Sequence, residues 1–306
     1  MKLLKRVAIV ALGVLALLAV AGYFYLDKKP DGLPERHGRV SSELFAGDQS
    51  KQPLIVGLGG AEGGNPWASQ YWKPQRERFL AEGYAFLAIG YFGTPESPAQ
   101  LDRIALEGVH AAVLAAAQDP RIDGQCIVIM GGSKGAELAL ELASRYKAYR
   151  AVVALVGGSA VFPALTPQMN TSSWSMDGKE LAFVPVPWSA TGALLTGDLR
   201  AAFQKMMDNT QAMSDAAIRV EDIAGPVLFM SATRDEFWPS TEMSAAMVQR
   251  MKVGKFAHHI QHEAVDGTHA APLKHFDIVE QFLANHVKGA LHSCRTPALT
   301  FPSSPA

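Results

Sequence analysis

Short, wholly apolar runs alternate with longer amphipathic segments along most of the chain. The apolar runs predict strands near 53–60, 84–93, 125–132, 151–158 and 225–234, and a more polar run near 256–265 predicts one more. The amphipathic segments predict helices over 73–83, 98–120, 134–146, 240–252 and 275–289. Short strands without polar alternation are typical of a parallel sheet covered by helices on both faces. The pattern therefore predicts an α/β fold with a mostly parallel sheet.

Residues 159–215 interrupt this alternation. They contain four prolines, two tryptophans and a methionine-containing helical pattern, and the stretch is too long for a simple strand–helix connection. We predict an inserted lid or cap here, within a domain that spans 53–290. Residues 30–52 are predicted to be a linker with room for one edge strand, and 291–306 a disordered tail.

The first 29 residues form a separate unit. Three basic residues precede 20 uncharged positions, 7–26, which as a helix match the roughly 30 Å hydrocarbon thickness of a bilayer. The basic N-terminus predicts an uncleaved transmembrane anchor, with the rest of the chain exported to the periplasmic or extracellular side. The alternative is a cleaved signal peptide, because residues 19–21 before Gly22 resemble a cleavage site.

Charge and cysteine content exclude several classes of partner. The 28 basic and 29 acidic residues nearly cancel, so we expect no nucleic-acid partner. Two cysteines, Cys126 and Cys294, are too few for a disulfide framework or a cysteine-rich zinc site. Cys126 lies in an apolar run and is predicted to pack as a small buried hydrophobe.

The sequence Gly131-Gly132-Ser133-Lys134-Gly135 fits G-x-S-x-G, with a predicted strand before it and a predicted helix after it. This context is typical of a nucleophile elbow, in which a serine occupies a strained turn at the carboxyl end of a sheet. The residues two before and two after the serine must be small, so that strand and helix can pack. Both are glycine here, and we predict that Ser133 is a nucleophile.

A serine needs a base and an orienting acid to act as a nucleophile, and in hydrolases with this elbow they follow in the order serine, acid, histidine. Asp235 stands directly after the predicted strand at 225–234 and is the favoured acid, with Glu236 as the alternative. His269 lies in a short loop after the next strand and is the favoured base.

Three other histidines leave a metal site open as an alternative. His258, His259 and His262 lie in or beside the strand near 256–265. Strand alternation puts His259 on the opposite face from the other two, which favours a solvated strand face instead. We therefore expect neither a metal nor an organic cofactor.

Two backbone N–H groups would bind a developing oxyanion. One is that of Lys134 at the start of the helix, and the other belongs to the glycine-rich loop 57–64 after the first strand. We favour the N–H of Ala61, with Gly60 or Glu62 as alternatives. A nucleotide phosphate loop is excluded, because no Gly-Lys-Ser/Thr follows and the spacing is not G-x-G-x-x-G.

Several stretches together resemble a known family. "GGSKGAELALELAS", "GYAFLAIGYFGTPESPAQLD", "GVHAAVLAAAQDPRI", "EDIAGPVLFMSATRDEFWPSTEMSAAMV" and "DGTHAAP" are similar to the C-terminal catalytic domain of acyl-CoA thioester hydrolases and bile acid-CoA:amino acid N-acyltransferases. The resemblance covers about 52–290 and implies an α/β-hydrolase fold. It also implies that Ser133 is the nucleophile, Asp235 the acid and His269 the base.

This chain departs from that family in two ways. Eukaryotic members carry a β-rich N-terminal domain, where this chain has a predicted membrane segment and a short linker. Amidating members tend to have cysteine at the elbow, so the serine here favours hydrolysis over transfer to an amine. An exported domain would also meet little CoA, which leaves an oxyester or another acyl donor open as the substrate.

The sequence thus predicts a membrane-anchored serine hydrolase of small-molecule acyl esters or thioesters. Tryptophans and methionines of 159–215 would line an acyl pocket or pack as ordinary core. The alternatives are acyl transfer to an amine or alcohol, and a non-catalytic binding module on the same fold. An intact set of serine, aspartate and histidine argues against the binding module.

Overall fold

A computed structural model of the chain describes Gly22 and residues 28–288. Of the predicted anchor at 1–29, only Gly22, Lys28 and Lys29 are among these residues, and the predicted tail at 291–306 lies outside them. Within the described part of the chain, no helix is long and apolar enough to span a bilayer. The anchor and its alternative, the cleaved signal peptide, therefore stay predictions.

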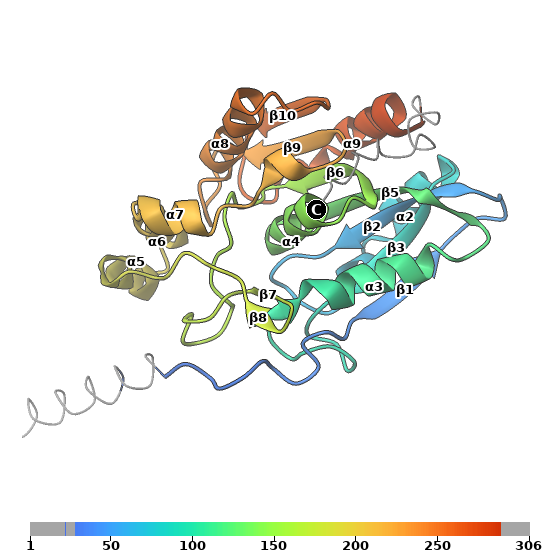
Figure 1. The fold of residues 1–306 in the computed structure, drawn as a ribbon. Coiled ribbons are helices and arrows are strands. Elements are labelled where there is room, and N and C mark those ends of the chain that lie inside the picture. Colours follow the sequence, from blue (N-terminus) through green and yellow to red (C-terminus); the bar gives the residue numbers. More distant parts are fainter. Residues whose placement is uncertain (1–21, 23–27, 289–306) are drawn as a thin grey trace, which may run out of the picture.

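The main sheet has seven strands in the order β1-β3-β2-β5-β6-β9-β10 (Figure 1). β1 runs antiparallel to β3, and every other neighbouring pair is parallel. The predicted mostly parallel sheet is therefore confirmed, and the edge strand allowed for in 30–52 is β1. The strands are β1 (Ser41–Phe45), β2 (Gln52–Leu58), β3 (Ala85–Gly90), β5 (Ile122–Gly132), β6 (Tyr149–Leu155), β9 (Val227–Ala232) and β10 (Ile260–Val265).

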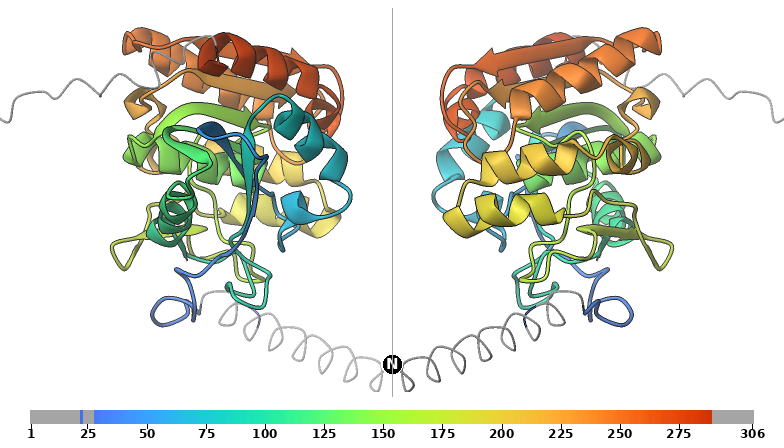
Figure 2. Two further views of the ribbon diagram at one scale, coloured as in Figure 1. Left: turned by 90° about the vertical axis from the view of Figure 1, so that its right-hand side faces the viewer. Right: turned by 90° about the vertical axis from the view of Figure 1, so that its left-hand side faces the viewer.

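Helices cover both faces of this sheet, as the side views in Figure 2 show. The first face packs against α3 (Leu106–Ala116), α4 (Lys134–Arg145) and α8 (Ser240–Val253). The second packs against α2 (Lys73–Ala81) and α9 (Phe276–Leu283). The shorter helical turns are η1 (Pro66–Ala68), η2 (Trp188–Ala190), η3 (Val220–Asp222), η4 (Ala271–Lys274) and η5 (Ala284–Lys288).

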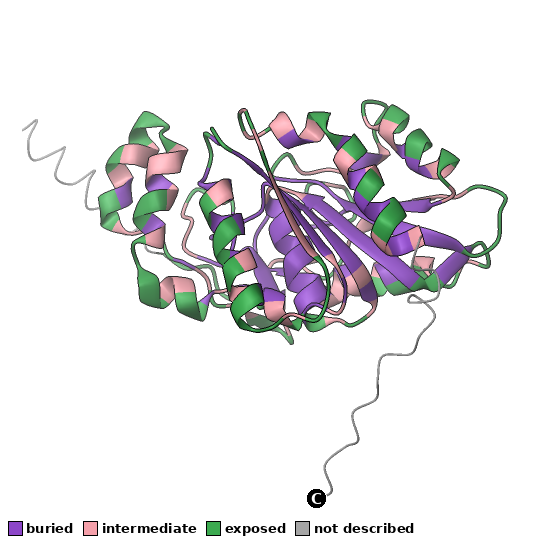
Figure 3. Cartoon of the chain, turned by 90° about the horizontal axis from the view of Figure 1, so that it is seen from above, coloured by how far each residue is buried: buried purple, intermediate pink, exposed green. Residues whose placement is uncertain are grey.

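β2 shows why its residues form a central strand. Leu54 and Val56 point into the core under α3, α4 and α8, whereas Ile55 points into the core under α2 and α9. This is the two-residue period of a pleated strand. All residues of β2 are buried, and in Figure 3 the inner strands of the sheet are buried along most of their length, whereas the edge strands β1 and β10 are not.

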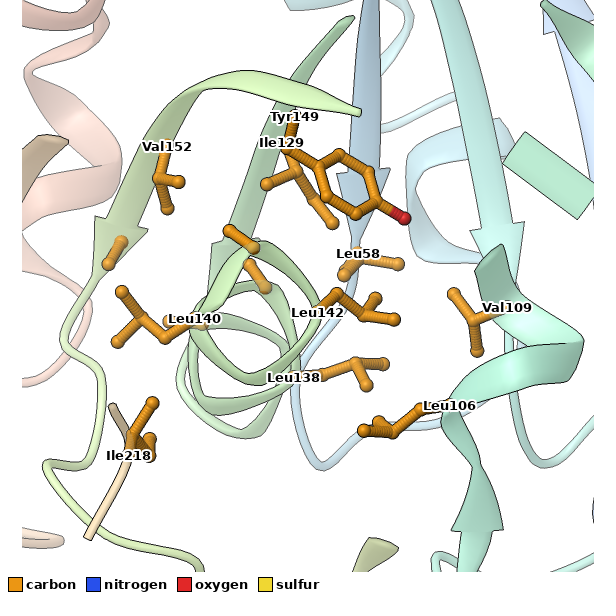
Figure 4. Packing of buried hydrophobic residues seen from close by; sticks show 14 of the residues in the cluster. Leu58, Leu106, Val109, Ile129, Leu138, Leu140, Leu142, Tyr149, Val152 and Ile218 are labelled. Carbon is orange, nitrogen blue, oxygen red and sulfur yellow. The ribbon is translucent and has the colours of Figure 1, made fainter. Parts of the chain in front are cut away.

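α4 is buried on nearly all sides. Figure 4 shows Leu138 and Leu142 pointing toward Leu106 and Val109, whereas Leu140 points toward Ile218. Each fully buried leucine stabilises the fold by about 1.5–3 kcal/mol. The helix that follows Ser133 is therefore held firmly in the core.

The predicted helix over 98–120 is wrong in its first third, because α3 begins only at Leu106. Asp102 and Arg103 form a buried ion pair at 2.8 Å, and Thr171 donates a hydrogen bond to the Asp102 carboxylate. The next two residues form the short strand β4 (Ile104–Ala105), which pairs with β7 (Trp174–Met176). Contacts with a distant segment thus outweigh the local helical pattern.

The segment 159–215 folds as two parts. β7 pairs with β8 (Lys179–Glu180), and three helices follow: α5 (Thr191–Thr196), α6 (Leu199–Met207) and α7 (Thr210–Asp215). The predicted methionine-containing helix corresponds to α6 and α7. The three helices lie together at one end of the molecule in Figure 1. That the segment acts as a lid stays a prediction.

Cys126 is fully buried in β5, as its apolar surroundings predicted. It is also disulfide-bonded, which the sequence did not predict. The other cysteine of the chain, Cys294, lies outside the described residues.

Candidate active site

Ser133 stands alone between β5 and α4, with φ 55° and ψ −119°. A positive φ is rare for a residue with a side chain and costs about 1–3 kcal/mol. The turn is held on both sides, because the Ser133 N–H donates to the Leu155 carbonyl at 2.8 Å and its carbonyl accepts from Ala136 and Glu137. This is the strained strand-to-helix turn of a nucleophile elbow.

The glycines around Ser133 are required by close backbone contacts. A Cβ on Gly131 would lie 2.0 Å from the Gly135 carbonyl oxygen, and one on Gly135 would lie 2.1 Å from the Gly59 carbonyl oxygen. A Cβ on Gly132 would meet no atom within 4 Å. The prediction that the positions two before and two after the serine must be small is confirmed.

Asp235 and His269 come from the loops after β9 and β10, which are neighbouring strands. The Nδ1 atom of His269 lies 2.8 and 2.9 Å from the two carboxylate oxygens of Asp235. A carboxylate only accepts, so Nδ1 carries the proton and Nε2 of the neutral ring carries the free lone pair. Asp235 thus fixes the tautomer that a general base needs.

The Asp235 carboxylate is fully buried and is held ionised by its donors. Its Oδ1 accepts from the backbone N–H groups of Phe237 at 3.0 Å and Trp238 at 3.3 Å. Burial works against ionisation, but hydrogen bonds from His269 and Ser240 outweigh it and lower the pKa of Asp235. The ring of Phe237 meets His269 edge-on at 4.8 Å and restricts its rotation.

Glu236 was the alternative acid, and it binds a different part of the histidine. Its carboxylate accepts a hydrogen bond from the His269 backbone N–H at 2.8 Å. The geometry therefore favours Asp235 over Glu236 as the partner of the imidazole.

The other histidines considered have other partners. His262 Nε2 lies 2.8 Å from the Ser231 hydroxyl, and the His259 ring stacks on that of His286 at 4.1 Å. Among Gly22 and residues 28–288, no three histidine, cysteine, aspartate or glutamate side chains are placed to hold a metal ion.

The loop after β2 lies directly against the elbow. A Cβ on Gly60 would lie 3.2 Å from both the Gly132 carbonyl oxygen and the Ser133 Cβ. Lys134 is the first residue of α4, and N–H groups in the first turn of a helix have no partner within the helix. The predicted oxyanion donors of Lys134, Gly60 and Ala61 thus belong to residues that surround Ser133.

Ser133 and His269 line one cavity of about 340 Å³, with Gly60, Ala61 and Lys134 in the same wall. The volume suits a small-molecule site. The rest of the wall is mostly apolar and includes Trp67, Trp72, Leu165, Leu199, Phe203, Phe237 and Trp238.

The insertion contributes three apolar side chains to the cavity, and of the two alternatives for its tryptophans and methionines, packing as core holds for Trp174 and Met206. Leu165, Leu199 and Phe203 line the cavity, whereas the insertion's tryptophans and methionines do not. Trp174 is fully buried in the core, and Trp188 is 70% exposed.

A buried ion pair beneath Ser133 was not singled out by the sequence. Lys134 Nζ lies 2.7 Å from Glu137 Oε1, and both side chains are almost inaccessible to solvent. The same oxygen accepts from the Trp174 indole N–H at 2.8 Å and from the Phe162 N–H at 3.2 Å. A lysine and a glutamate three residues apart inside an otherwise buried helix were the available signal.

A protein-family model matches more than half of the chain. The family described as BAAT / acyl-CoA thioester hydrolase C terminal matches residues 104–269. Acyl-coenzyme A thioesterase 5 of Mus musculus is 28% identical over 261 residues, which cover 80% of this chain and 58% of that protein. Acyl-coenzyme A thioesterase 1 of Mus musculus is 32% identical over 222 residues, which cover 72% and 49%. The chain spans about half the length of the curated relatives it matches.

Solved structures share the fold. A puromycin-hydrolyzing peptidase of Mycobacterium tuberculosis superimposes with a TM-score of 0.56 at 15% identity, over 84% of this chain and 39% of that one. At this level of identity the likeness concerns the fold alone, which is that of an α/β-hydrolase.

Proposed function

The chain belongs to the BAAT / acyl-CoA thioester hydrolase C-terminal family, and from this premise we propose that it is a serine hydrolase of acyl thioesters or carboxylic esters. The proposal rests chiefly on one observation. His269, whose Nδ1 binds Asp235, lines the same cavity as Ser133, the residue held at φ 55° on the elbow.

In the proposed first step, Ser133 Oγ attacks the acyl carbonyl carbon while His269 Nε2 takes the hydroxyl proton. Asp235 stabilises the imidazolium that forms. The N–H groups of Lys134 and Ala61, or of Gly60, donate to the oxyanion of the tetrahedral intermediate.

The intermediate then collapses, and His269 returns the proton to the departing thiolate or alkoxide. This leaves an acyl ester on Ser133. In the second half, His269 takes a proton from water, and the resulting hydroxide attacks the acyl carbonyl. Collapse of that intermediate releases the carboxylic acid and regenerates the serine.

The character of the cavity wall supports an apolar acyl group. Apart from His269, its ionisable side chains are Glu62 and Lys134, and the Lys134 ammonium is paired with Glu137. No unpaired cation among the wall residues thus faces a CoA phosphate. A neutral ester or thioester fits this wall at least as well as an acyl-CoA.

Acyl transfer to an amine or alcohol is the second candidate, because the same acyl-enzyme would serve both reactions. A serine oxyester gives way to water readily, which favours hydrolysis. A non-catalytic binding role is less consistent with a cavity-lining histidine whose Nδ1 is hydrogen-bonded to a buried carboxylate.

We also propose that the domain is exported and stays attached to the membrane through residues 7–26. The basic residues before position 7 and the disulfide at Cys126 support this location, since disulfides persist mainly in oxidising compartments. A phosphatase reporter fused after residue 306 should be active, and the protein should remain with membranes after carbonate washing. A soluble product that begins at Gly22 would establish a cleaved signal peptide instead.

The test of the catalytic proposal is Ser133→Ala, compared with Ser214→Ala, which removes an exposed hydroxyl in α7. Ser133→Ala should lower kcat/KM on p-nitrophenyl esters by on the order of 10⁴-fold or more and abolish labelling by a fluorophosphonate probe. Ser214→Ala should behave as wild type. Esterase activity in Ser133→Ala within tenfold of wild type would rule out Ser133 as the nucleophile.

A further inference from the structure

Tyr91 contacts the loop that carries the proposed oxyanion donors. It follows β3, the strand beside β2, and its side chain is 2% exposed. Its hydroxyl donates to the Gly59 carbonyl at 2.7 Å and lies 3.3 Å from the Gly60 carbonyl. Tyr91 thus binds both peptide units that link Gly59, Gly60 and Ala61.

These hydrogen bonds decide where the N–H groups of the loop point. In a trans peptide the C=O of one residue and the N–H of the next point in opposite directions, and residues 28–288 contain no cis peptide. Because Tyr91 holds the Gly59 and Gly60 carbonyls on its own side, the N–H groups of Gly60 and Ala61 point away from it.

The loop also contacts the elbow. The Cα of Gly60 faces Ser133, as the 3.2 Å approach of an added Cβ shows. Glycines have the largest conformational freedom of all residues, so two in succession do not hold a peptide orientation by themselves. A hydrogen bond from a fixed side chain supplies that restraint.

Tyr91 is itself rigidly held. Its ring lies 5.8 Å from that of Trp174 and 5.2 Å from that of Phe92, and Gly64 at the far end of the loop donates to the Phe92 carbonyl at 2.9 Å. Burial, with Glu62 and Glu137 nearby, raises the pKa of Tyr91 well above its usual range. The hydroxyl therefore remains protonated and able to donate.

We propose that Tyr91 is a positioning residue, whose hydroxyl orients the peptides of Gly59 and Gly60 so that the next N–H groups face the oxyanion. The proposal rests on the proposed function, since it concerns the same reaction. Tyr91 touches neither the nucleophile nor the acyl group in this role and acts only through the loop.

The test is Tyr91→Phe, which removes one oxygen and keeps the ring. With a short-chain p-nitrophenyl ester, kcat should fall about ten- to a hundredfold, less than the 10²–10³-fold typical when an oxyanion donor is removed outright. KM should change less than about twofold. Affinity for a trifluoromethyl ketone, which forms a tetrahedral adduct, should fall in parallel with kcat, whereas affinity for the carboxylate product should not.

Tyr149→Phe is the matched control, because it also removes a buried tyrosine hydroxyl, which lies 3.0 Å from His110 Nδ1. It should keep wild-type kcat. Thermal unfolding of both variants gives the folded fraction, so that each rate refers to folded protein. A wild-type kcat per folded Tyr91→Phe molecule, or an equal loss in Tyr149→Phe, would overturn the inference. Either result would leave the proposed function intact, provided that Ser133→Ala remains inactive.

Discussion

Two buried carboxylates near Ser133, those of Asp235 and Glu137, have different roles. Asp235, in the loop after β9, binds His269 Nδ1 at 2.8 Å. Glu137, in the first turn of α4, binds Lys134 Nζ at 2.7 Å. Each is an acid paired with a base and removed from solvent, yet only the Asp235 pair includes a base with an ionisable nitrogen free to face the cavity.

The two acids also differ in how well their charge is compensated. Burial disfavours the charged form of both. For Asp235, the hydrogen-bond donors around the carboxylate outweigh the effect of burial, and its pKa is lowered. For Glu137, burial outweighs the attraction of the Lys134 ammonium, and the pKa of Glu137 is raised. Burial also lowers the pKa of Lys134. The Glu137 Oε2 atom is buried without a hydrogen-bond partner in the described part of the chain.

A buried ion pair beside a nucleophile is therefore not by itself evidence that its residues take part in catalysis. Glu137 connects α4 to Trp174 and Phe162, residues after β6 that are distant in sequence. Its bonds therefore join two parts of the fold. The bonds of Asp235 instead orient one imidazole ring at the cavity.

Asp235→Asn is the largest expected effect. The amide can hold His269 in the wrong tautomer, so kcat/KM for a p-nitrophenyl ester should fall on the order of 10⁴-fold, with little change in fold. Glu236→Gln is the control, since Glu236 binds only the His269 backbone N–H, and it should lose less than about tenfold. Equal losses in the two variants would contradict the assignment of Asp235 as the acid.

Glu137→Leu should show the reverse pattern. Removing one partner of a buried pair leaves the Lys134 ammonium uncompensated and costs about 3–5 kcal/mol of stability, measurable by urea unfolding. Activity per folded molecule should stay within about tenfold of wild type, because the Lys134 backbone N–H is unchanged.

The double variant Lys134→Met/Glu137→Leu separates charge burial from lost contacts. It should recover much of the lost stability, because apolar side chains often replace a buried ion pair without net cost. If Glu137→Leu instead abolished turnover in fully folded protein, Glu137 would be needed for catalysis, as Asp235 is proposed to be.

The contrast between these acids also explains what the sequence could predict. Ser133, Asp235 and His269 each follow a recognisable strand, and parallel strands end at one edge of a sheet, so local patterns place them together. The requirement for small residues at positions 131 and 135 is also visible in the local sequence. The catalytic roles of Ser133, Asp235 and His269 stay predictions.

Features that depend on distant contacts were missed. The helix predicted from 98 begins at Leu106, because Asp102 and Arg103 bind a segment about 70 residues later. The Glu137 pair and the contact of Tyr91 with Gly59 likewise depend on which segments meet in space. The hydrophobic periodicity of the sequence does not predict these tertiary contacts.

The lowered pKa of Asp235 gives a dependence of stability on pH. A carboxyl whose folded-state pKa is depressed stabilises the fold above its unfolded value, and this stabilisation is lost as pH falls through the folded-state pKa. The difference in unfolding free energy between wild type and Asp235→Asn should therefore be largest at neutral pH and shrink below the model-peptide value of 3.8. Urea unfolding at pH 7 and at steps below pH 4 measures it. A difference that does not change with pH would show that the pKa of Asp235 is not depressed.

A third carboxylate, Glu62, is exposed where Asp235 and Glu137 are buried, and its substitution should have the smallest effect on activity. It lines the cavity but is exposed to solvent, so water and salt screen its charge. A CoA leaving group carries several negative charges that Glu62 would repel, whereas an N-acetylcysteamine thioester carries none. Glu62→Gln should therefore raise the ratio of kcat/KM for an acyl-CoA to that for the matching N-acetylcysteamine thioester by about threefold at low salt.

The change should come mainly from KM, and it should disappear near 1 M salt, where the screening length is about 3 Å. Glu77→Gln, which removes an exposed carboxylate of α2 that does not line the cavity, should leave the ratio unchanged. A Glu62→Gln ratio equal to that of wild type, or a rise that persists at high salt, would mean that Glu62 does not repel the leaving group through its charge. Asp235, Glu137 and Glu62 would then differ in burial and partners, but the exposed member would have no part in substrate selection.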